Sequence, residues 1–271
     1  MSYDYRLLKT SLPLVYSEAD SIIIALDKDL RTWTGSKFQV EEQFFDWLDV
    51  FDTENKINIY RDNFFLPNIS PMENEVRERK MLASKMGIGN WLIQVDSDEY
   101  FVNFKAFAEA LRSRNKYLEN PEKNRIQIAG YYINLINIPG MEFCTYQNPA
   151  IKNLPPTIPI MSQGETPKQR VIYVPHIVIH ECLSRSEDEI KTKFSNWGHS
   201  HQVNGEIFLD KWRQIDETNY KQFEDLFYLE PEKWKRLNYV QGQSMNKIIE
   251  NLKSRELKPS KTHLLSKNFG Q

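Results

Sequence analysis

The chain has 271 residues, 40% of them hydrophobic, which is enough to form one large core. Its net charge of -2 argues against a protein that mainly coats nucleic acid. It contains no apolar run of about 18 residues and no charged-then-apolar leader, so we expect neither a membrane span nor a secretory signal, and at most peripheral membrane contact. The two cysteines, Cys144 and Cys182, are too few for a disulfide framework or a zinc site. We therefore expect a cytoplasmic protein that does not bind nucleic acid.

The first part of the chain alternates between helical and extended patterns. A short β-branched run such as 21–26 predicts a buried strand, and Pro71 is well placed in the first turn of a helix that ends near Gly87. The elements expected, in the order helix, strand, helix, strand, helix, strand, cover 4–20, 21–26, 40–50, 56–60, 71–87 and 91–95. This alternation predicts an α/β fold with a mostly parallel sheet flanked by helices.

The second part changes character. A helix is expected over 104–116, strands over 125–138 and 170–179, and a helix after the capping-box pair Ser186 and Glu189. Residues 139–170 show no period and are rich in Pro and Gly, so we expect a functional loop, partly mobile without ligand, on the acceptor side of a cleft. Residues 206–271 have helical spacing. We expect one domain over 1–205 and a C-terminal helical extension, 206–271, packed on it.

The acidic run Asp96, Asp98 and Glu99 directly follows the apolar segment 91–95. Alternate side chains of an extended segment point to the same side, so Asp96 and Asp98 can converge. Paired carboxylates suit a hard cation such as Mg²⁺ or Mn²⁺, which leaves other positions to water and substrate phosphates. A solvated acidic turn is the ordinary alternative. The position after a buried strand favours a ligand site, because open α/β sheets bind ligands at the carboxyl ends of their strands.

Four passages resemble the family 2 glycosyltransferases and related bacterial sugar transferases of the GT-A fold. In chain order they are SIIIALDKD, NEVRERKMLASKMGIGNW, VDSDEYF and HECLSRSEDEIKTKFSNWGHS. The first resembles the family's strand followed by acids near the nucleotide base, and the second its basic helix before the metal strand. The third is similar to the D-x-D-E-[FY] metal motif. The fourth is similar to a late segment with a strand-end histidine, Arg-Ser, a lysine-containing helix and Trp-Gly-His.

The resemblance implies a metal-dependent glycosyltransferase that moves a sugar from a nucleoside-diphosphate sugar, most commonly UDP-linked, to a glycan or other hydroxyl acceptor with inversion. The reaction leaves a diphosphate of growing negative charge, which a divalent cation stabilises. Asp96 and Asp98 would hold Mn²⁺ or Mg²⁺, and the resemblance implies that His180 is a further ligand. The alternative for His180 is a hydrogen-bonded histidine at a strand end.

The resemblance also implies residues that bind the nucleotide. Asp27 and Asp29 are candidates for the base or ribose, and Arg77, Arg79 and Lys80 for the diphosphate or base. The alternatives are turn acids in the first case and solvated helix charges in the second. Glu99 would orient the metal site or bind the acceptor.

The catalytic base is not assigned. An inverting transferase needs a carboxylate within hydrogen-bond reach of the acceptor hydroxyl. Glu142, Glu165 and Glu181 all lie in the appropriate half of the chain, and nothing local chooses among them.

The chain departs from the family pattern in two places. The family begins with an apolar strand, whereas this chain starts at the helix that would follow it, and Lys80 with Met81 replaces the usual Arg-Asn pair. One other hypothesis is therefore a non-catalytic GT-A-like domain that binds a glycan or protein through 139–170 and the C-terminal helices. A sugar nucleotidyltransferase is a further alternative, although the chain has no Gly-rich phosphate loop near its start.

Overall fold

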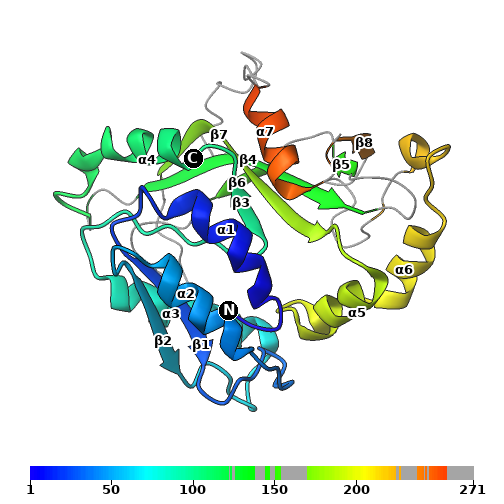
Figure 1. The fold of residues 1–271 in the computed structure, drawn as a ribbon, viewed down its shortest axis with the longest axis horizontal. Coiled ribbons are helices and arrows are strands. Elements are labelled where there is room, and N and C mark those ends of the chain that lie inside the picture. The colour runs from blue at the N-terminus through cyan, green and yellow to red at the C-terminus, as the bar shows by residue number, and fades with distance from the viewer. Residues whose placement is uncertain are drawn as a thin grey trace.

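The computed structural model describes residues 1–121, 123, 126–137, 144–146, 150–153, 170–223, 226, 237–240, 242 and 244–254. Within these residues a small parallel sheet lies beside a larger mixed sheet, and helices surround both (Figure 1). The mixture of helices and strands confirms the α/β class. None of the helices in these ranges is both long and apolar enough to cross a membrane.

The small sheet consists of strands β1 and β2, which pair in parallel from Ile22↔Ile57 to Asp27↔Asp62. Helices α1 and α2 cover it, and Phe44 of α2 packs into its core cluster. The bounds are β1 Ile22–Asp27, β2 Ile57–Asp62, α1 Leu8–Val15 and α2 Glu42–Phe51. These elements confirm the predicted strands and the second helix, whereas the opening helix is shorter than predicted and follows a 3-10 turn at Tyr5–Leu7.

Helix α3 (Pro71–Met86) confirms the predicted start and stop signals. The Ser70 hydroxyl accepts a hydrogen bond from the backbone N–H of Glu73 at 3.3 Å, and the Glu73 carboxylate accepts one from the backbone N–H of Ser70 at 2.8 Å. This reciprocal cap satisfies donors that the first helical turn leaves unpaired. Gly87 ends the helix with φ of 78°, a conformation that favours glycine.

The predicted strand over 91–95 is wrong, and so is the order of strand and acids. Residues 91–96 belong to no strand, and β3 (Glu99–Phe101) begins only after Asp98. The apolar side chains at 91, 93 and 95 pack against the cluster around Phe104 and Phe107, so packing buries them without a ladder partner. A short apolar run alone does not distinguish these two ways of being buried.

The larger sheet has the strand order β3-β7-β4-β5-β8, with β6 also paired to β4. Strands β4 and β7 are parallel, whereas the pairings β3–β7, β4–β5, β4–β6 and β5–β8 are antiparallel. The expectation of a mostly parallel sheet is therefore wrong for this sheet, because short returning strands pair with the two long ones. The bounds are β4 Ile126–Ile136, β5 Cys144–Tyr146, β6 Ala150–Asn153, β7 Arg170–Leu183 and β8 Leu237–Tyr239.

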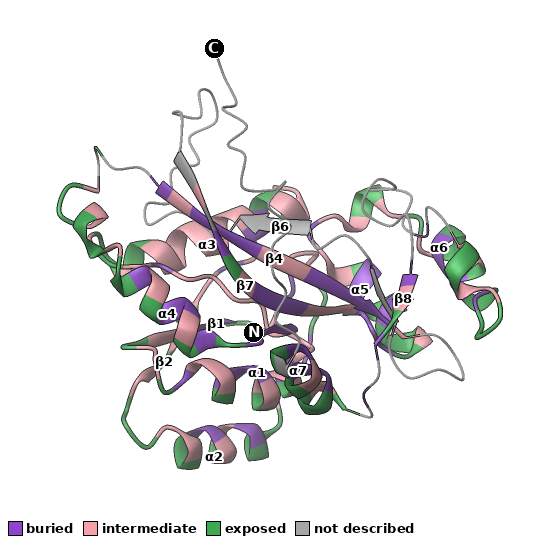
Figure 2. Cartoon of the chain, turned by 90° about the horizontal axis from the view of Figure 1, so that it is seen from above, coloured by how far each residue is buried: buried purple, intermediate pink, exposed green. Residues whose placement is uncertain are grey.

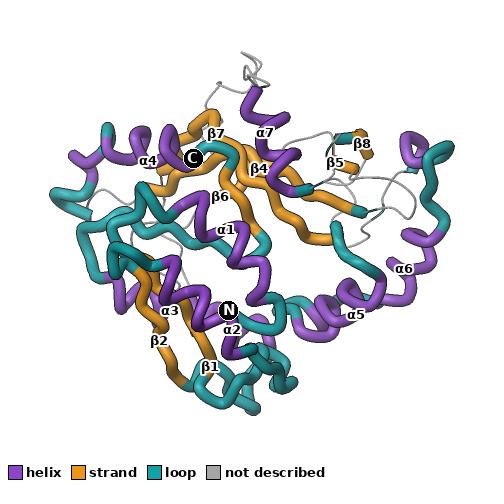
Figure 3. The backbone as a smooth tube through the Cα atoms, viewed as in Figure 1, coloured by secondary structure: helices purple, strands orange, loops and turns teal. Residues whose placement is uncertain are grey.

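Helices cover both faces of the larger sheet. Alternate residues of β3 and β7 point to opposite faces, so Phe101 and Val178 pack with α4 (Phe104–Arg112), while Tyr100 and Ile179 pack with α7 (Met245–Ser254). Figure 2 shows buried stretches along β4 and β7, and Figure 3 shows the long loops that join the elements.

Helices α5 (Glu187–Asn196) and α6 (Gly205–Arg213) pack against the ends of β4 and β7, and α5 begins with the predicted Ser186–Glu189 capping box. The described part of 206–271 contains helices, as expected, but also β8 of the larger sheet. Most of 139–170 lies outside the described residues, so its proposed role as an acceptor loop stays a prediction.

Candidate functional site

Asp98 lies buried among three basic side chains. Its Oδ2 accepts hydrogen bonds from Lys193 Nζ at 2.6 Å and from an Arg185 guanidinium nitrogen at 2.7 Å, and lies 3.4 Å from His180 Nε2. Only 4% of Asp98 is exposed, 7% of Arg185 and 8% of Lys193. The structure thus brings Asp98, which directly precedes β3, together with His180 of β7 and with two cations that were not predicted from the sequence.

The ladder between β3 and β7 positions these groups. Glu99 of β3 pairs with His180 of β7, which places the preceding Asp98 beside β7. The His180 Nδ1 lies 2.9 Å from Asn134 Oδ1 on β4, and this contact turns Nε2 toward Asp98. One extra residue in β7 after the Asn134↔His180 pair forms a bulge, where Cys182 has φ of 33°. The bulge redirects the chain toward Arg185 and the start of α5.

The charges in this cluster stabilise one another. Burial opposes ionisation of Asp98, but Lys193 and His180 outweigh it and hold the pKa of the carboxyl well below its usual value. Burial would also lower the pKa of His180, yet interactions with Cys182 and Asp98 raise it to about 10. For Lys193, the charge of Asp98 overcomes burial and raises the pKa above its usual value. All three partners of Asp98 are therefore cationic at neutral pH.

The residues around Asp98 do not fit a divalent cation in this arrangement. Lys193 and Arg185 already occupy Oδ2 of this carboxylate, and both are cations that repel a metal ion. Throughout the described ranges, no group of three or more His, Cys, Asp or Glu side chains is arranged to hold a metal ion. The metal-ligand roles given to Asp96, Asp98 and His180 therefore stay predictions from sequence.

Asp96 and Glu99 differ sharply from each other in exposure. The side chain of Asp96 is 42% exposed, and its Oδ2 lies 3.5 Å from an Arg79 guanidinium nitrogen. Glu99 is 3% exposed and accepts a hydrogen bond from the Tyr132 hydroxyl at 2.8 Å. The second Glu99 oxygen accepts a hydrogen bond from the Asp96 backbone N–H at 3.2 Å. Glu99 thus holds the acidic turn in shape, and Asp96 faces outward from it.

Asp27 holds two loops together. Its Oδ1 accepts hydrogen bonds from the backbone N–H groups of Asp29 and Arg31, and its Oδ2 from those of Phe64 and Phe65. The residue is 4% exposed, so in this arrangement its carboxylate serves as a turn acid, and a contact with the nucleotide base or ribose stays a prediction. Asp29, by contrast, is exposed.

The basic residues of α3 fall into different environments. Arg77 Nη1 donates hydrogen bonds to the carbonyl oxygens of Asn63 at 2.5 Å and Phe64 at 3.1 Å, so it fixes the loop after β2. Arg79 forms an ion pair with Glu75 at 2.6 Å and also reaches Asp96, with 38% of its side chain exposed. Lys80 is partly buried on the same helix. Arg79 thus contacts the acidic turn through Asp96.

Glu181 is the one base candidate within the described residues, since Glu142 and Glu165 lie outside them. Its carboxylate accepts a hydrogen bond from the Tyr100 hydroxyl, and burial raises the pKa of the Glu181 carboxyl above its usual value. Glu181 therefore has a buried hydrogen-bond partner, Tyr100, and its role as the catalytic base stays a prediction.

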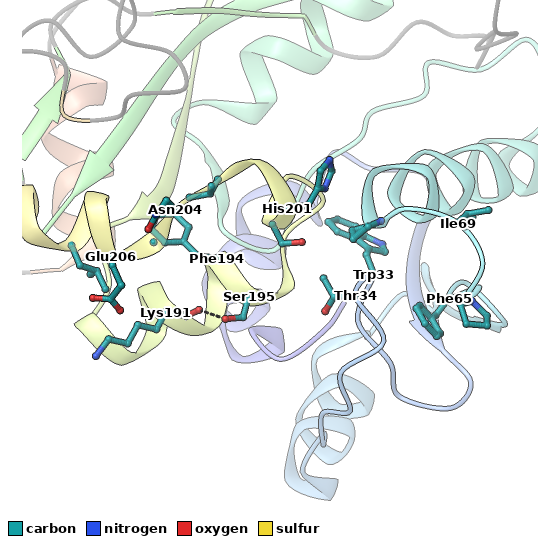
Figure 4. Close-up of a pocket in the computed structure, with 16 residues that line it drawn as sticks. Trp33, Thr34, Phe65, Ile69, Lys191, Phe194, Ser195, His201, Asn204 and Glu206 are labelled. Carbon is teal, nitrogen blue, oxygen red and sulfur yellow. Dashed lines mark hydrogen bonds between the residues drawn. The ribbon is translucent and has the colours of Figure 1, made fainter.

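A pocket of about 720 Å³ opens between the two halves of the chain (Figure 4). Trp33 and Thr34 from the loop after β1, and Phe65 from the loop after β2, face Lys191 and Ser195 of α5 across it. Helix α5 therefore borders the pocket and also carries Lys193 into the Asp98 cluster. The loops after parallel strands are where open α/β sheets bind ligands. Trp33, its indole N–H hydrogen-bonded to Glu78 at 2.6 Å, gives the pocket an aromatic wall.

The sequence reading did not assign Arg185, Lys193, Asn134 or Glu75. Arg185 and Lys193 do lie within the fourth passage, as its Arg-Ser and its lysine-containing helix, so a signal for them was present. Their partner Asp98 is far away in sequence, and a local pattern does not reveal such a pairing.

No protein-family model, no curated protein and no solved structure matches this chain.

Proposed function

We propose that this chain is a glycosyltransferase that moves a sugar from a nucleoside-diphosphate sugar, with UDP favoured, to a hydroxyl group of a glycan or other acceptor. One observation supports this most: passages far apart in the sequence converge on one site. Asp98 of the third passage contacts His180, Arg185 and Lys193 of the fourth. Arg79 of the second passage contacts Asp96 of the third. Such convergence of the second, third and fourth passages is expected if these three form one functional site and are not unrelated motifs.

The pocket beside α5 is the proposed binding site for the donor and acceptor. Its aromatic and proline-rich wall suits the flat face of a base or sugar ring, and a few polar groups on the opposite wall would fix orientation. Arg79 is not one of the residues that line this pocket; half-exposed beside Asp96, it would meet the diphosphate of a donor that extends beyond the pocket. The negative charge that develops on the leaving diphosphate requires fixed positive groups of this kind.

A second candidate function is a non-catalytic domain that binds a glycan in the same pocket. Two carboxylates that already have protein partners favour this function. Asp27 accepts four backbone hydrogen bonds, and Asp98 forms ion pairs with Arg185 and Lys193. Neither side chain is presented to a ligand in this arrangement.

Calorimetric titration with a panel of nucleoside diphosphates tests the proposal. The wild-type chain should bind at least one of them, and Arg79→Gln should weaken that binding by about tenfold, because a charge-assisted contact to phosphate is lost. Arg112→Gln is the matched control, since Arg112 is half-exposed on α4 and pairs with Glu18. If no nucleoside diphosphate binds while the folded protein binds glycans, the non-catalytic function replaces the transferase.

A further inference from the structure

The Asp98 carboxylate carries two hydrogen bonds from cations on one oxygen. Lys193 Nζ approaches Oδ2 to 2.6 Å and the Arg185 guanidinium to 2.7 Å. A divalent cation would bind a carboxylate oxygen at a comparable or shorter distance, so at Oδ2 it would compete for the positions that these groups fill. The Asp98 side chain is 5% exposed, which leaves little room to approach it from solvent.

Lys193 sits on a rigid element, helix α5. Helix α5 begins at the capping box of Ser186 with Glu189, and this fixes the rotation of the helix. Ile190 and Phe194 of α5 are buried in the core cluster at the ends of β4 and β7. Lys193 lies between them in sequence and points to Asp98. It is therefore part of the packed helix and not a surface lysine that can swing aside.

The local charge also disfavours an added cation. Asp98 faces Lys193, Arg185 and His180, and the further acid at Arg185 is Asp4, at 3.5 Å. A divalent ion at Asp98 would place two more positive charges beside side chains that are themselves buried and cationic, where screening by solvent is weak.

We propose that the ammonium of Lys193 and the guanidinium of Arg185 take the place of a divalent cation at Asp98, so that the chain does not bind Mn²⁺ or Mg²⁺ at this carboxylate. The inference goes beyond the proposed function, because it concerns what Asp98 holds whether or not the chain transfers a sugar.

Titration with Mn²⁺ alone, followed by electron paramagnetic resonance of the free ion, tests the inference. Wild type and Asp98→Asn should bind Mn²⁺ equally weakly, through surface acids only. Lys193→Met should bind Mn²⁺ about tenfold more tightly or better, because a unit positive charge next to Asp98 is gone. The double variant Lys193→Met with Asp98→Asn should lose that gain. Lys105→Met, on the exposed side of α4, is the matched control.

Two results would overturn the inference. One is saturable Mn²⁺ binding by the wild type that Asp98→Asn abolishes, either alone or with excess UDP present to supply phosphate ligands. The other is a folded Lys193→Met variant that binds Mn²⁺ no better than the wild type. Circular dichroism verifies folding, and Arg185→Met serves as the second cation-removing variant if Lys193→Met does not fold.

Discussion

Lys193 on α5 places its ammonium nitrogen 2.6 Å from Oδ2 of Asp98, although the two residues are 95 positions apart in the chain. Asp98 precedes β3 and Lys193 is on α5, so this contact ties the start of the sheet to the helix that borders the pocket. The contact bears on the proposed function, because it joins two of the passages on which that proposal rests.

Asp98→Asn should destabilise the chain strongly. The substitution removes the only carboxylate that Lys193 and His180 contact among the ion pairs of the described residues, and leaves buried cations without compensation. We expect a loss of about 3–5 kcal/mol in the free energy of unfolding, measured by urea denaturation. Asp49→Asn, on the exposed part of α2, should change it little. An equal, small effect of both substitutions would show that the cluster is not held by charge.

Asp27→Asn should destabilise the chain, whereas Asp29→Asn should not. An amide at position 27 turns an NH₂ group toward two backbone N–H donors, which costs about 1–3 kcal/mol for each donor left unsatisfied. Asp29 is exposed and its side chain can lose its charge with little consequence. The reverse pattern, a neutral Asp27→Asn with impaired nucleotide binding, would restore the role predicted from the sequence.

The pKa values of two histidines on β7 should be shifted in opposite directions from the ordinary value. Burial and the positive charge of Arg114 lower the pKa of His176, whereas Cys182 and Asp98 outweigh burial and raise the pKa of His180 to about 10. The folded state holds the His180 proton more tightly, so this stabilisation is full below about pH 6.5 and is lost as pH rises toward 10. For His176 the sign is opposite, and stability is lost as pH falls below about 6.5.

Nuclear magnetic resonance of the imidazole Cε1 protons measures both histidine pKa values directly. His180→Gln should remove the alkaline loss of stability and His176→Gln the acidic one, so each variant is the control for the other. Similar pKa values near that of a free histidine would contradict the charge assignment of the Asp98 cluster.

Gly198→Ala should destabilise the packing of α3 on the segment after α5. A methyl group on Gly198 would lie 2.0 Å from Oε2 of Glu75, which is buried and paired with Arg79. We expect a loss of about 1–3 kcal/mol from overpacking. When Glu75→Ala has already removed the obstructing carboxylate, Gly198→Ala should lower the free energy of unfolding by clearly less. If the losses in the free energy of unfolding simply add in the double variant, the methyl group does not clash with the Glu75 carboxylate.

Local sequence signals predicted the elements whose ends are determined locally. Pro71 marks the start of α3, because the first helical turn tolerates a residue without an N–H group. Ser186 with Glu189 marks the start of α5, because a helix start needs side-chain acceptors for its first N–H groups. The apolar run 91–95 was misread, because pairing with a neighbouring strand depends on distant residues. The partners of Asp98 could not be predicted for the same reason. A local acidic motif is compatible with a metal ligand, and only the fold brings Arg185 and Lys193 next to this carboxylate.

Release of a nucleoside diphosphate from a panel of nucleotide sugars, after removal of divalent cations with EDTA, tests the central claim most directly. The account predicts release from at least one sugar nucleotide, unchanged when Mn²⁺ is restored and reduced by Arg79→Gln but not by Arg112→Gln. Release that appears only with Mn²⁺, in a chain whose Mn²⁺ binding Asp98→Asn abolishes, would contradict the role given to Lys193 and Arg185 at Asp98, and the absence of release and binding for every donor would contradict the transferase itself.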